Sequence, residues 1–452
     1  MIVAKFGGTS VGDAAAIRRT AGIIRARLPQ QPIVVVSALA GTTNALLAAA
    51  EQASSGNLVA AIAGVQQLRE RHLAAVQELA GSGPESQELA ATVSAFLDEL
   101  AHLVEALSVL GHATPRSLDA IASLGEQLSA PIVTAAFRRE GIDAVLVDAR
   151  RVMVTDDDHG RAKPLPERIA DAARDLVVPL VLANRVPVLG GYIGATVTGV
   201  TTTLGRGGSD YSASLIGAGV EATAIEIWTD VDGMLTADPR VVRGARLIDH
   251  IRFDEAAELA SFGAKVLHPN TITPAVARGI PVLVFNSMRS EGSGTRITAD
   301  APRVAVRAIA GKGNTVIVKV RSPRMLGTPG FLQQIFEVFA RHKTSVDVVT
   351  TSEVSVSLTV DDDQYLEAVV AELRQCGDVG VERSRGILAV VGASLAANPS
   401  AMATAIAAVG DVHLHMVSLD STGINLTMVV DADAVKPLMQ RLHDAFFPEA
   451  AA

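Results

Sequence analysis

The sequence contains almost no cysteine and few aromatic residues. Cys376 is the single cysteine among 452 residues, so no intramolecular disulfide can form and a reducing compartment is expected. Aromatic residues make up only 3%, which disfavours a surface that stacks nucleic-acid bases. The formal net charge of -9 also disfavours a nucleic-acid partner, because phosphate backbones select basic surfaces. Any anionic ligand must therefore be attracted by local lysine and arginine side chains.

Long uninterrupted hydrophobic runs are missing as well. The most apolar stretch, residues 176–195, contains Asn184, Arg185 and two prolines, a composition that is wrong for a membrane span. The N-terminal residues enter a strand-like run directly, without the charged and apolar regions of a secretory leader. The sequence therefore predicts a soluble, cytoplasmic protein with no membrane partner.

The residues that are present favour a folded α/β chain of two to three domains. Hydrophobic residues make up 49% and charged residues 19%, as in globular proteins. Residues 2–6 and 32–39 are apolar and β-branched, and residues 14–28 between them have helical spacing. This alternation is the βαβ pattern of a parallel sheet with helices on both faces. Further strand-like runs cover residues 143–149, 186–193, 223–230 and 280–287.

A long helical segment interrupts this pattern between Thr43 and Leu110. Its spacing of Ala, Leu, Glu and Gln indicates helices. The breaks SSGN at residues 54–57 and GSGPES at residues 81–86 are expected to divide it.

The C-terminal third has a different pattern, in which short strands alternate with helices. A strand, helix, strand, strand, helix order occurs twice in units of roughly 60–75 residues, which indicates a tandem repeat. The strand-like runs of this part cover residues 304–311, 314–322, 345–353, 354–361, 386–393, 412–420 and 424–431. A generic α+β tail that completes the core is the alternative reading.

The first candidate site is the sequence KFGGTSVG at residues 5–12. Two adjacent glycines let the backbone approach a ligand closely, and Thr9, Ser10 or Asp13 is suited to cap the helix that follows. Lysine is a compact positive charge that suits a transferring phosphoryl group. Neither familiar nucleotide fingerprint is present, so this segment alone is equally consistent with a capped turn that carries an exposed lysine.

The second candidate is the sequence TTTLGRGGSDYSAS at residues 201–214. Glycines surround Arg206, which suits the presentation of a guanidinium group to a carboxylate. The alternative is a loop with a helix cap at Ser209 or Asp210, although a cap does not explain an arginine among three glycines.

Two further segments carry weaker signals. Residues 225–240 form a polar loop after a strand, where open α/β sheets often bind ligands, although their Asp-Gly and Asp-Pro pairs are also ordinary turn formers. In residues 258–269, Lys265 is by default a surface lysine. His268 is expected to be structural, because no His or Cys pair has the spacing of a zinc site.

The acidic run at residues 156–159 is expected to be a solvated loop.

In this order, the segments KFGGTSV, VVVSALAGTTN, LGEQLSA, TTTLGRGGSDYSA, WTDVDGMLTADPR and FGAKVLHP resemble the aspartate kinases of the amino-acid kinase family. The two C-terminal units resemble the paired ACT regulatory domains of these enzymes. The resemblance covers essentially the whole chain. It implies an amino-acid-kinase-like α/β domain with an open, mainly parallel sheet and helices on both faces, followed by two ferredoxin-like α+β ACT domains.

The resemblance also implies domain boundaries and an assembly. Residues 1–297 would form the catalytic domain and residues 298–452 the ACT region. The first ACT unit, about residues 314–387, would be inserted into the second, which comprises about residues 303–313 and 388–452. ACT sites usually form between two chains, so a homodimer through the ACT domains is implied, with a tetramer as the alternative.

In aspartate kinases, the γ-phosphoryl group of ATP passes to the side-chain carboxylate of L-aspartate, which gives 4-phospho-L-aspartate. This product is the entry to lysine, threonine and methionine synthesis. By similarity, Lys5 with the backbone of Gly7 and Gly8 would hold the transferring group, and Asp210 would orient Lys5. No general base is required, because the attacking carboxylate is already ionised at pH 7.

Substrate contacts follow from the same resemblance. Arg206 would pair with a carboxylate of aspartate, and Glu126 would pair with its ammonium group. The residues that complete this pocket would be Ser37, Thr43 and Ser209. The residues lining the ATP site would be Lys5, Gly8, Thr229, Asp230, Leu235, Arg240, Lys265 and Val266. Mg²⁺ would bridge the phosphates without a metal cage made by protein alone. Many relatives carry tyrosine where this chain has Leu235, so one contact near the nucleotide is expected to be missing.

Residues 324–361 resemble the lysine-sensing ACT segment of the lysine-sensitive, single-function enzymes. Asp347 and Glu353 are chemically suited to an ammonium group, while backbone groups at a helix start are suited to a carboxylate. L-lysine is therefore the expected feedback inhibitor. The residues that would bind lysine are Met325, Thr328, Phe331, Leu332, Ser345, Val346, Asp347, Ser352 and Glu353.

Two alternatives remain at this point. Other kinases of the family act on glutamate, N-acetylglutamate or UMP, but they generally lack the tandem ACT tail and the KFGGTSV sequence motif. A catalytically inactive ligand sensor would keep the fold, but it would have no need for both Lys5 and Asp210.

Overall fold

The computed structural model describes the chain except for residues 206, 263–266, 268–270, 362–364 and 449–452. The chain divides into two compact units. The first comprises residues 1–234 and 266–299, and the second comprises residues 235–265 and 300–452. The sequence did not indicate that residues 235–265 group with the second unit. The domain boundaries and the insertion of one ACT unit into the other stay predictions.

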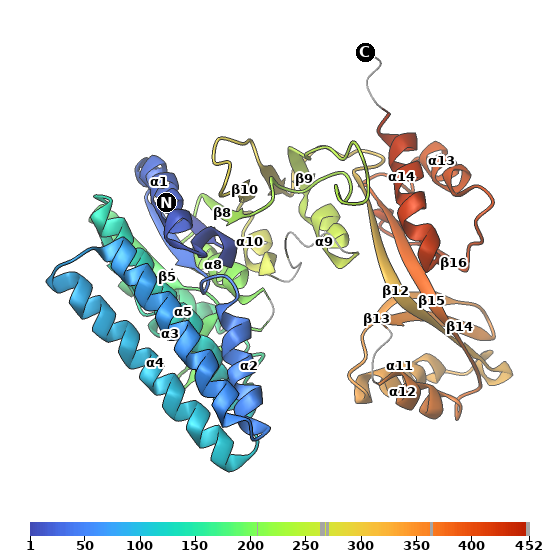
Figure 1. Cartoon of the computed structure of the whole chain (residues 1–452). Helices are drawn as coiled ribbons and strands as arrows, with labels where there is room; N and C mark the ends of the chain where they lie inside the picture. Colours follow the sequence, from blue (N-terminus) through green and yellow to red (C-terminus); the bar gives the residue numbers. More distant parts are fainter. Residues whose placement is uncertain (206, 263–266, 268–270, 362–364, 449–452) are drawn as a thin grey trace. The chain divides into compact units, whose positions relative to one another are not determined.

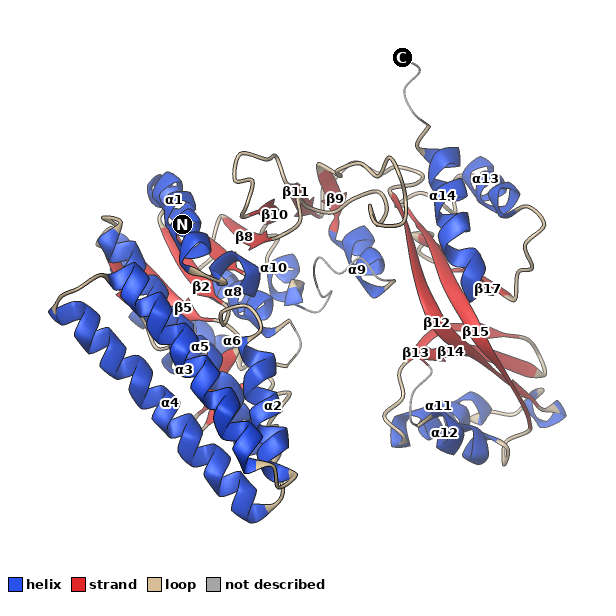
Figure 2. Ribbon diagram, viewed as in Figure 1, coloured by secondary structure: helices blue, strands red, loops and turns tan. Residues whose placement is uncertain are grey.

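A mainly parallel sheet forms the centre of the first unit (Figures 1 and 2). Within this unit the strand order is β3-β5-β2-β1-β8-β10-β11, and only the pair of β10 with β11 is antiparallel. Every residue of β1, β2 and β5 is buried, as parallel strands covered on both faces require. The strands are β1 (Ile2–Phe6), β2 (Pro32–Val36), β3 (Ala144–Leu146), β5 (Val186–Gly190), β8 (Ala224–Thr229), β10 (Val282–Asn286) and β11 (Thr295–Thr298).

A small second sheet has the order β4-β6-β7. Its strands are β4 (Val154–Thr155), β6 (Ile193–Thr196) and β7 (Thr201–Thr203). Strand β6 pairs in parallel with β4 and antiparallel with β7. The last strand leads directly into the glycine-rich segment of the second candidate site.

The expected helical excursion is present, and both predicted breaks are confirmed. Helices α2 (Thr42–Ser54), α3 (Leu58–Ala80) and α4 (Pro84–Leu110) are separated at those two positions. The other helices of this unit are α1 (Ala14–Arg27), α5 (Pro115–Arg139), α6 (Pro166–Leu176), α7 (Val178–Leu182), α8 (Gly208–Gly219) and α10 (Thr273–Ala277), with 3-10 turns η1 (Gly8–Val11), η2 (Leu28–Gln30) and η3 (Ala149–Arg151).

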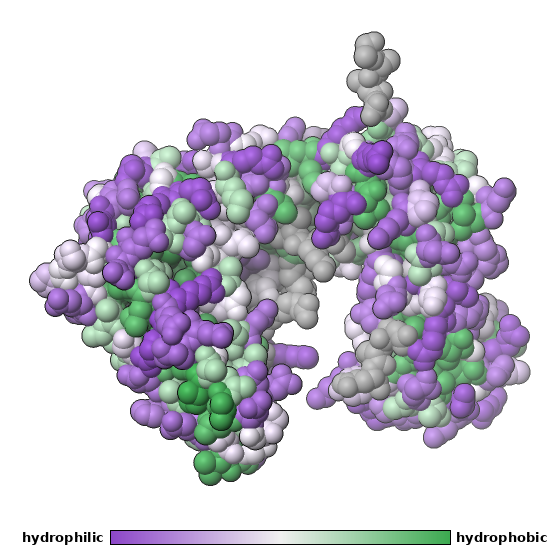
Figure 3. All heavy atoms as spheres, in the orientation of Figure 1, coloured by the Kyte–Doolittle hydropathy of each residue, from purple (hydrophilic) through white to green (hydrophobic). Residues whose placement is uncertain are grey.

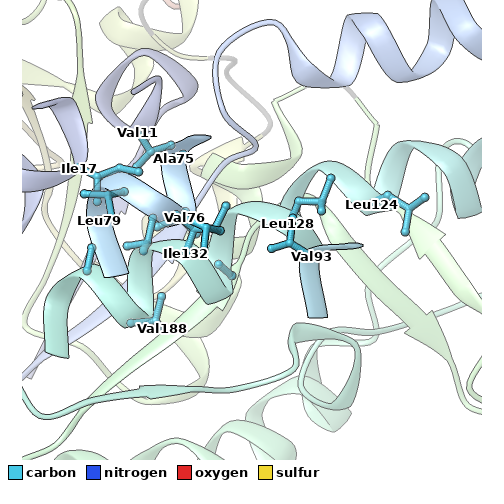
Figure 4. Close-up of a cluster of buried hydrophobic side chains, with 14 of the residues drawn as sticks. Val11, Ile17, Ala75, Val76, Leu79, Val93, Leu124, Leu128, Ile132 and Val188 are labelled. Atoms are coloured by element: carbon cyan, nitrogen blue, oxygen red, sulfur yellow. The ribbon is translucent and has the colours of Figure 1, made fainter. Parts of the chain in front are cut away.

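Helices cover both faces of the sheet, and this arrangement determines the direction of Lys5. Ala4 and Phe6 of β1 belong to a core shared with helices α1 to α5, part of which is shown in Figure 4. Because side chains alternate along a strand, Val3 and Lys5 point to the opposite face. Helix α8 packs there, since a Cβ on Gly217 would lie 3.6 Å from Val3. The β1 register therefore directs Lys5 toward α8.

The second unit contains a six-stranded antiparallel sheet with the order β13-β14-β12-β15-β17-β16. Its strands are β12 (Ala308–Arg321), β13 (Val346–Thr351), β14 (Ser355–Asp361), β15 (Asp378–Val391), β16 (Met416–Leu419) and β17 (Asn425–Asp431). The remaining elements are β9 (His250–Arg252), α9 (Phe253–Ser261), α11 (Phe331–Arg341), α12 (Leu366–Leu373), α13 (Pro399–Val409), α14 (Val435–Phe446), η5 (Pro323–Met325) and η6 (Ala432–Ala434). The predicted order of α/β domain followed by ferredoxin-like α+β region is confirmed.

One prediction about this sheet is wrong. The sequence indicated separate strands at residues 304–311 and 314–322, but the structure joins most of both into the single strand β12. The register with β15 shifts between Lys312 and Thr315, and Asn314 has a φ of 64°. The glycine-rich junction therefore makes a bulge within a continuous strand, where the sequence pattern suggested a strand end.

Two separate hydrophobic cores lie along this sheet. One contains Phe339 of α11 and Leu373 of α12, and the other contains Leu388 of β15 and Leu438 of α14. Each core thus pairs one part of the sheet with its own two helices, as the tandem repeat in the sequence indicates.

Hydrophilic side chains predominate on the face of the molecule drawn in Figure 3, with apolar residues scattered among them. Such scattered apolar exposure is normal for folded proteins. Within the described part of the chain, no helix combines the length and the apolar character that crossing a membrane requires.

Candidate active site

Lys5 and Asp210 form an ion pair at the centre of the first unit. Lys5 Nζ lies 2.6 Å from Asp210 Oδ1, and the two side chains are only 10% and 14% exposed. Lys5 is the fourth residue of β1, and Asp210 lies in the first turn of α8. A carboxylate at a helix N-terminus is stabilised by the helix dipole. The pair therefore holds the lysine ammonium in a fixed and mostly buried position.

The glycines after β1 bring the backbone close to this pair. A Cβ on Gly8 would lie 3.1 Å from the carbonyl oxygen of Ala38, so a side chain at this position would crowd the backbone that follows β2. The N–H of Gly7 donates to the Trp228 carbonyl oxygen at 3.0 Å and is therefore already used. The predicted helix cap at Asp13 is confirmed, since its Oδ1 accepts from the N–H of Ala16 at 2.8 Å.

A cavity of about 610 Å³ opens beside Lys5. This volume lies within the range of small-molecule sites. The residues that line it are Lys5, Gly8, Ser37, Ala38, Leu39, Ala40, Gly41, Thr43, Asn44, Leu47, Glu126, Tyr192, Gly205, Gly207, Gly208, Ser209 and Asp210. The structure therefore brings together Lys5, Gly8, Asp210 and the predicted aspartate contacts Ser37, Thr43, Glu126 and Ser209.

Glu126 is the most unusual ionisable group of this cavity. Its side chain comes from the middle of α5 and is 3% exposed. Oε1 accepts from the N–H of Ala38 at 3.1 Å, whereas Oε2 has no hydrogen-bond partner among the described residues. Burial raises the pKa of the Glu126 carboxyl to about 8, although the Ala38 N–H and the charge of Lys5 act in the opposite direction. A cationic group entering the cavity would meet an unpaired oxygen there.

Ser37 and Thr43 lie at a strand end and a helix start that face the cavity. The N–H of Ser37 donates to the Phe6 carbonyl oxygen at 3.0 Å, which ties the end of β2 to β1. Thr43 lies in the first turn of α2, whose preceding residue Gly41 has a φ of 78° and provides no side-chain cap. Uncapped N–H groups at a helix start attract anions.

The glycine-rich segment before α8 forms another wall of the cavity. Gly205 and Gly207 have φ values of 75° and 72°, a conformation that favours glycine. A Cβ on Gly208 would lie 2.7 Å from the Tyr192 ring, so this wall packs closely. Arg206 lies outside the described residues. A cap at Ser209 or Asp210 is wrong, because α8 begins at Gly208 with Gly207 as its N-cap, so both residues lie inside its first turn.

The predicted ATP contacts are less well defined than the aspartate contacts. Thr229 is the last residue of β8, and its hydroxyl donates to Asp230 at 3.2 Å. Leu235 and Arg240 fall in the segment that groups with the second unit. The Arg240 guanidinium is bound to Asp238 through two nitrogens, at 3.0 and 2.7 Å. The expected contacts Lys265 and Val266, like the neighbouring His268, lie outside the described residues.

The predicted effector residues lie around η5, the start of α11 and strand β13 in the second unit. Met325 and Val346 pack against the same core, which contains Phe331. Asp347 is not free, because its Oδ2 lies 2.9 Å from Lys312 Nζ. Lys312 also lies 2.7 Å from Asp361. The other residues of the predicted set, Thr328, Leu332, Ser345, Ser352 and Glu353, are exposed.

Sequence reasoning missed two features of the first unit. Tyr192 lines the cavity, but no motif distinguished it. His159 was expected in a solvated loop, and this is wrong for its side chain, which is 16% exposed and lies 2.7 Å from the buried Asp119. Asp157 and Asp158 are exposed as expected. Only the fold reveals that α5 carries a carboxylate beneath this loop.

No group of three or more His, Cys, Asp or Glu side chains is arranged to hold a metal ion among the residues that the structure describes. In the cavity itself, the described carboxylates are Glu126 and Asp210.

Comparison with known proteins places this geometry in a family. The model of the amino acid kinase family matches residues 1–286, and a model of the ACT domain matches residues 318–371. Lysine-sensitive aspartokinase 3 of Escherichia coli K12 is 35% identical over 463 residues, which cover 99% of each chain. Chloroplastic aspartokinase 3 of Arabidopsis thaliana is 35% identical over 461 residues, 98% of this chain and 81% of the plant protein.

Two solved structures of E. coli aspartokinase III are similar to the chain at 34% identity. The R-state complex with aspartate and ADP has a TM-score of 0.86 and covers 99% of this chain and 100% of that chain. The T-state complex with lysine and aspartate has a TM-score of 0.82 and covers 99% of each chain. Since both full-length relatives are aspartokinases and the family model spans the whole first unit up to residue 286, the chain belongs to the aspartokinases of the amino acid kinase family.

Proposed function

We propose that the chain transfers the γ-phosphoryl group of ATP to the side-chain carboxylate of L-aspartate and so produces 4-phospho-L-aspartate. This reaction is the first step toward lysine, threonine and methionine. The observation that carries the proposal is the buried Lys5–Asp210 ion pair beside a cavity lined by the Glu126 carboxyl, whose Oε2 has no hydrogen-bond partner among the described residues. The similar E. coli structure that contains aspartate and ADP supports the choice of both substrates.

In this proposal Lys5 stabilises the charge of the transferring phosphoryl group, and Asp210 holds Lys5 in place. Phosphoryl transfer depends mostly on positioning and charge neutralisation, and an ammonium that is 10% exposed interacts strongly with a nearby anion. Gly8 lets the substrate approach the backbone. The N–H of Gly7 is bound to Trp228, so Gly7 acts by shaping the turn.

Aspartate occupies the cavity with its two ends bound differently. The ammonium group meets Glu126, whose Oε2 has no partner among the described residues. Arg206 pairs with a carboxylate of the substrate, and Ser37, Thr43 and Ser209 complete the pocket. Glutamate, longer by one methylene, would have to fit the same fixed separation between Glu126 and Lys5.

The nucleotide site is proposed to contain Thr229, Asp230, Leu235, Arg240, Lys265 and Val266 in addition to Lys5 and Gly8. Mg²⁺ accompanies ATP and neutralises charge on its phosphates. The carboxylates of the cavity do not form a magnesium site of their own, because Asp210 is bound to Lys5 and Glu126 has a raised pKa. We therefore assign the ion to the phosphates of ATP.

A coupled assay with ATP, Mg²⁺ and L-aspartate, in which hydroxylamine traps the acyl phosphate, tests this function. Formation of aspartyl hydroxamate is expected. Turnover of glutamate, N-acetylglutamate or UMP without turnover of aspartate would assign the chain to a different kinase. Ligand binding without turnover of any of them would indicate a sensor.

We further propose that L-lysine inhibits the enzyme through the ACT region, residues 298–452. Within it, residues 314–387 form one ACT unit inserted into a second one, made of residues 303–313 and 388–452. The two separate cores of the second unit support this division. The effector site contains the nine residues named above, of which Asp347 and Glu353 supply carboxylates.

A homodimer through the ACT region is proposed as the working assembly of a cytoplasmic enzyme. Leu332 and Phe336 are 40% and 39% exposed and lie four residues apart on α11, so they share one face of that helix. Leu326 and Val354 are also exposed large apolar residues, and both are close in sequence to effector residues. Sedimentation analysis tests the proposal, since Leu332→Glu is expected to shift the dimer toward monomer.

A further inference from the structure

A buried carboxylate lies beneath the cavity wall and has no role in the reaction described so far. Asp119, near the start of α5, is 2% exposed. Oδ1 accepts from the Thr203 hydroxyl at 2.5 Å, and both oxygens accept from the N–H of Gly160, at 3.1 and 3.0 Å. His159 Nδ1 lies 2.7 Å from Oδ2 and donates there in the tautomer that carries its proton on Nδ1. Burial of this charge is thus compensated by donors from two other segments.

Both segments lead directly to the cavity. Thr203 is the last residue of β7, and the next residue, Leu204, donates its N–H to the Tyr192 carbonyl oxygen at 2.9 Å. A Cβ on Gly205 would lie 3.4 Å from the Gly160 carbonyl oxygen, so the loop held by Asp119 lies against the glycine-rich wall. Tyr192 and Gly205 both line the cavity.

The same helix also carries Glu126. Asp119 and Glu126 are seven residues apart on α5, which places them on one face of the helix two turns apart. Asp119 therefore connects the helix that carries Glu126 to the wall formed by Tyr192 and Gly205.

We propose that Asp119, acting through Thr203 and His159, is a positioning residue that sets the distance between Glu126 and the glycine-rich wall and thereby the fit of aspartate. The inference rests on the proposed function, in which aspartate binds across this space. It predicts a selective effect, because none of the residues proposed to bind ATP belongs to either of these two walls. If Asp119 only stabilised the fold, its substitution would lower the melting temperature without a selective change in the KM for aspartate.

The sharpest test is a pair of variants at Thr203. Thr203→Val removes the hydroxyl that donates to Asp119 and keeps the size, whereas Thr203→Ser keeps the hydroxyl. Hydrogen bonds to charged groups contribute about 1.5–3 kcal/mol, which corresponds to roughly tenfold or more in affinity. We expect Thr203→Val to raise the KM for aspartate by about tenfold with the KM for ATP within about twofold, and Thr203→Ser to restore the value of the unmodified enzyme. Asp119→Asn is expected to act in the same direction, and calorimetric binding of aspartate gives the same comparison without turnover.

Thr155→Val provides the matched control. It removes the Thr155 hydroxyl of β4, which lies 2.7 Å from the hydroxyl of Thr202, the neighbour of Thr203 on β7, and which donates to the Asp156 carbonyl oxygen at 2.8 Å. This control is expected to lower the melting temperature and leave the KM for aspartate unchanged. If Thr203→Val and Thr155→Val lower the melting temperature alike and neither changes the KM for aspartate, the inference is overturned. Failure of the unmodified enzyme to phosphorylate aspartate would instead overturn the proposed function.

Discussion

Glu126 of the catalytic unit and Asp347 of the regulatory unit are assigned the same task, which is to bind the ammonium group of an amino acid. Their surroundings are opposite. Glu126 is buried, with one oxygen that has no partner among the described residues and a pKa raised to about 8. Asp347 lies at the start of an edge strand and already contacts the ammonium group of Lys312 at 2.9 Å.

This difference indicates two ways of preparing a carboxylate for an ammonium ligand. At Glu126, burial removes the carboxyl from water and favours its neutral form. The positive charge of the substrate ammonium group then favours ionisation of the carboxyl. At Asp347 the carboxylate already forms an ion pair with Lys312 of the same chain, so an effector must share or displace that cation. The catalytic site is therefore sensitive to pH, and the regulatory site is sensitive to the strength of an internal ion pair.

The largest effect is expected from Lys5→Ala, which removes the charge that the catalytic site is built around. Loss of one preorganised group that stabilises transition-state charge lowers kcat by on the order of 10²–10³-fold. The fold is expected to persist, because Asp210 is 14% exposed and can be hydrated. The hydroxamate assay measures kcat, and circular dichroism checks folding.

Lys436→Ala is the control. It removes a lysine at an exposed position on α14 that has no role in the proposed reaction, and it is expected to retain full activity. An unchanged kcat in Lys5→Ala would remove Lys5 from the mechanism. It would leave Glu126 as a binding group without catalytic neighbours.

Glu126→Gln tests the catalytic half of the comparison. The amide keeps the acceptor for the Ala38 N–H but cannot ionise, so the substrate ammonium loses a charged partner. A charged hydrogen bond of about 1.5–3 kcal/mol corresponds to an increase of roughly 10–100-fold in the KM for aspartate. The KM for ATP is expected to change little. Equal increases in both KM values would show that the variant damages the cavity as a whole.

The pH dependence of aspartate binding follows from the pKa of Glu126. Because the ionised form binds the ammonium group, the KM for aspartate is expected to fall by up to tenfold per pH unit as pH rises toward about 8, then level off. Initial rates between pH 6 and 8.5 measure this. Glu126→Gln is expected to flatten the profile, and an unchanged profile in that variant would assign the titration to another group.

The stability of the folded chain has the opposite dependence on pH. The folded state binds the Glu126 proton more tightly than the unfolded state, so it is favoured at low pH and loses this advantage as pH rises from about 4.5 to about 8. The loss is at most about 1.4 kcal/mol per pH unit. Thermal unfolding of the unmodified enzyme relative to Glu126→Gln across this range measures the difference.

Much of the fold could be predicted because its periodic patterns are long. Apolar runs predicted β1 and β2, although β2 ends at Val36 within the predicted residues 32–39. Gly and Ser residues predicted the breaks between α2, α3 and α4. The continuous strand β12 could not be predicted, because two glycines and Asn314 signal a turn locally, while pairing with β14 and β15 keeps the strand extended through the bulge.

The candidate site was predictable where a motif carried it. Lys5, Gly8 and Asp210 lie in distinctive segments and meet in the cavity as expected. Asp119 and His159 lie 40 residues apart in ordinary sequence, and their contact arises only when α5 packs beneath the loop. The raised pKa of Glu126 likewise depends on burial by distant segments, which the local sequence does not specify.

The smallest predicted effect concerns Lys312 and tests the regulatory half of the comparison. Lys312 lies between Asp347 and Asp361, at 2.9 and 2.7 Å. Burial lowers its pKa, but the hydrogen bonds to Asp361 and Asp347 outweigh burial and raise it, so Lys312 stays charged and repels a second ammonium group. Lys312→Met is therefore expected to lower the lysine concentration for half-inhibition by about two- to fivefold, the scale of one partly exposed ion pair.

Asp347→Asn, which removes the binding carboxylate itself, should raise that concentration by roughly tenfold. Inhibition curves with lysine, measured for both variants beside the unmodified enzyme, decide between two roles for the internal cation. Opposite shifts mean that Lys312 competes with the effector for Asp347. If Lys312→Met instead weakens inhibition as Asp347→Asn does, Lys312 holds Asp347 in its binding position. The contrast with Glu126, which has no cation of the same chain as a hydrogen-bond partner among the described residues, then concerns orientation and not competition for the carboxylate.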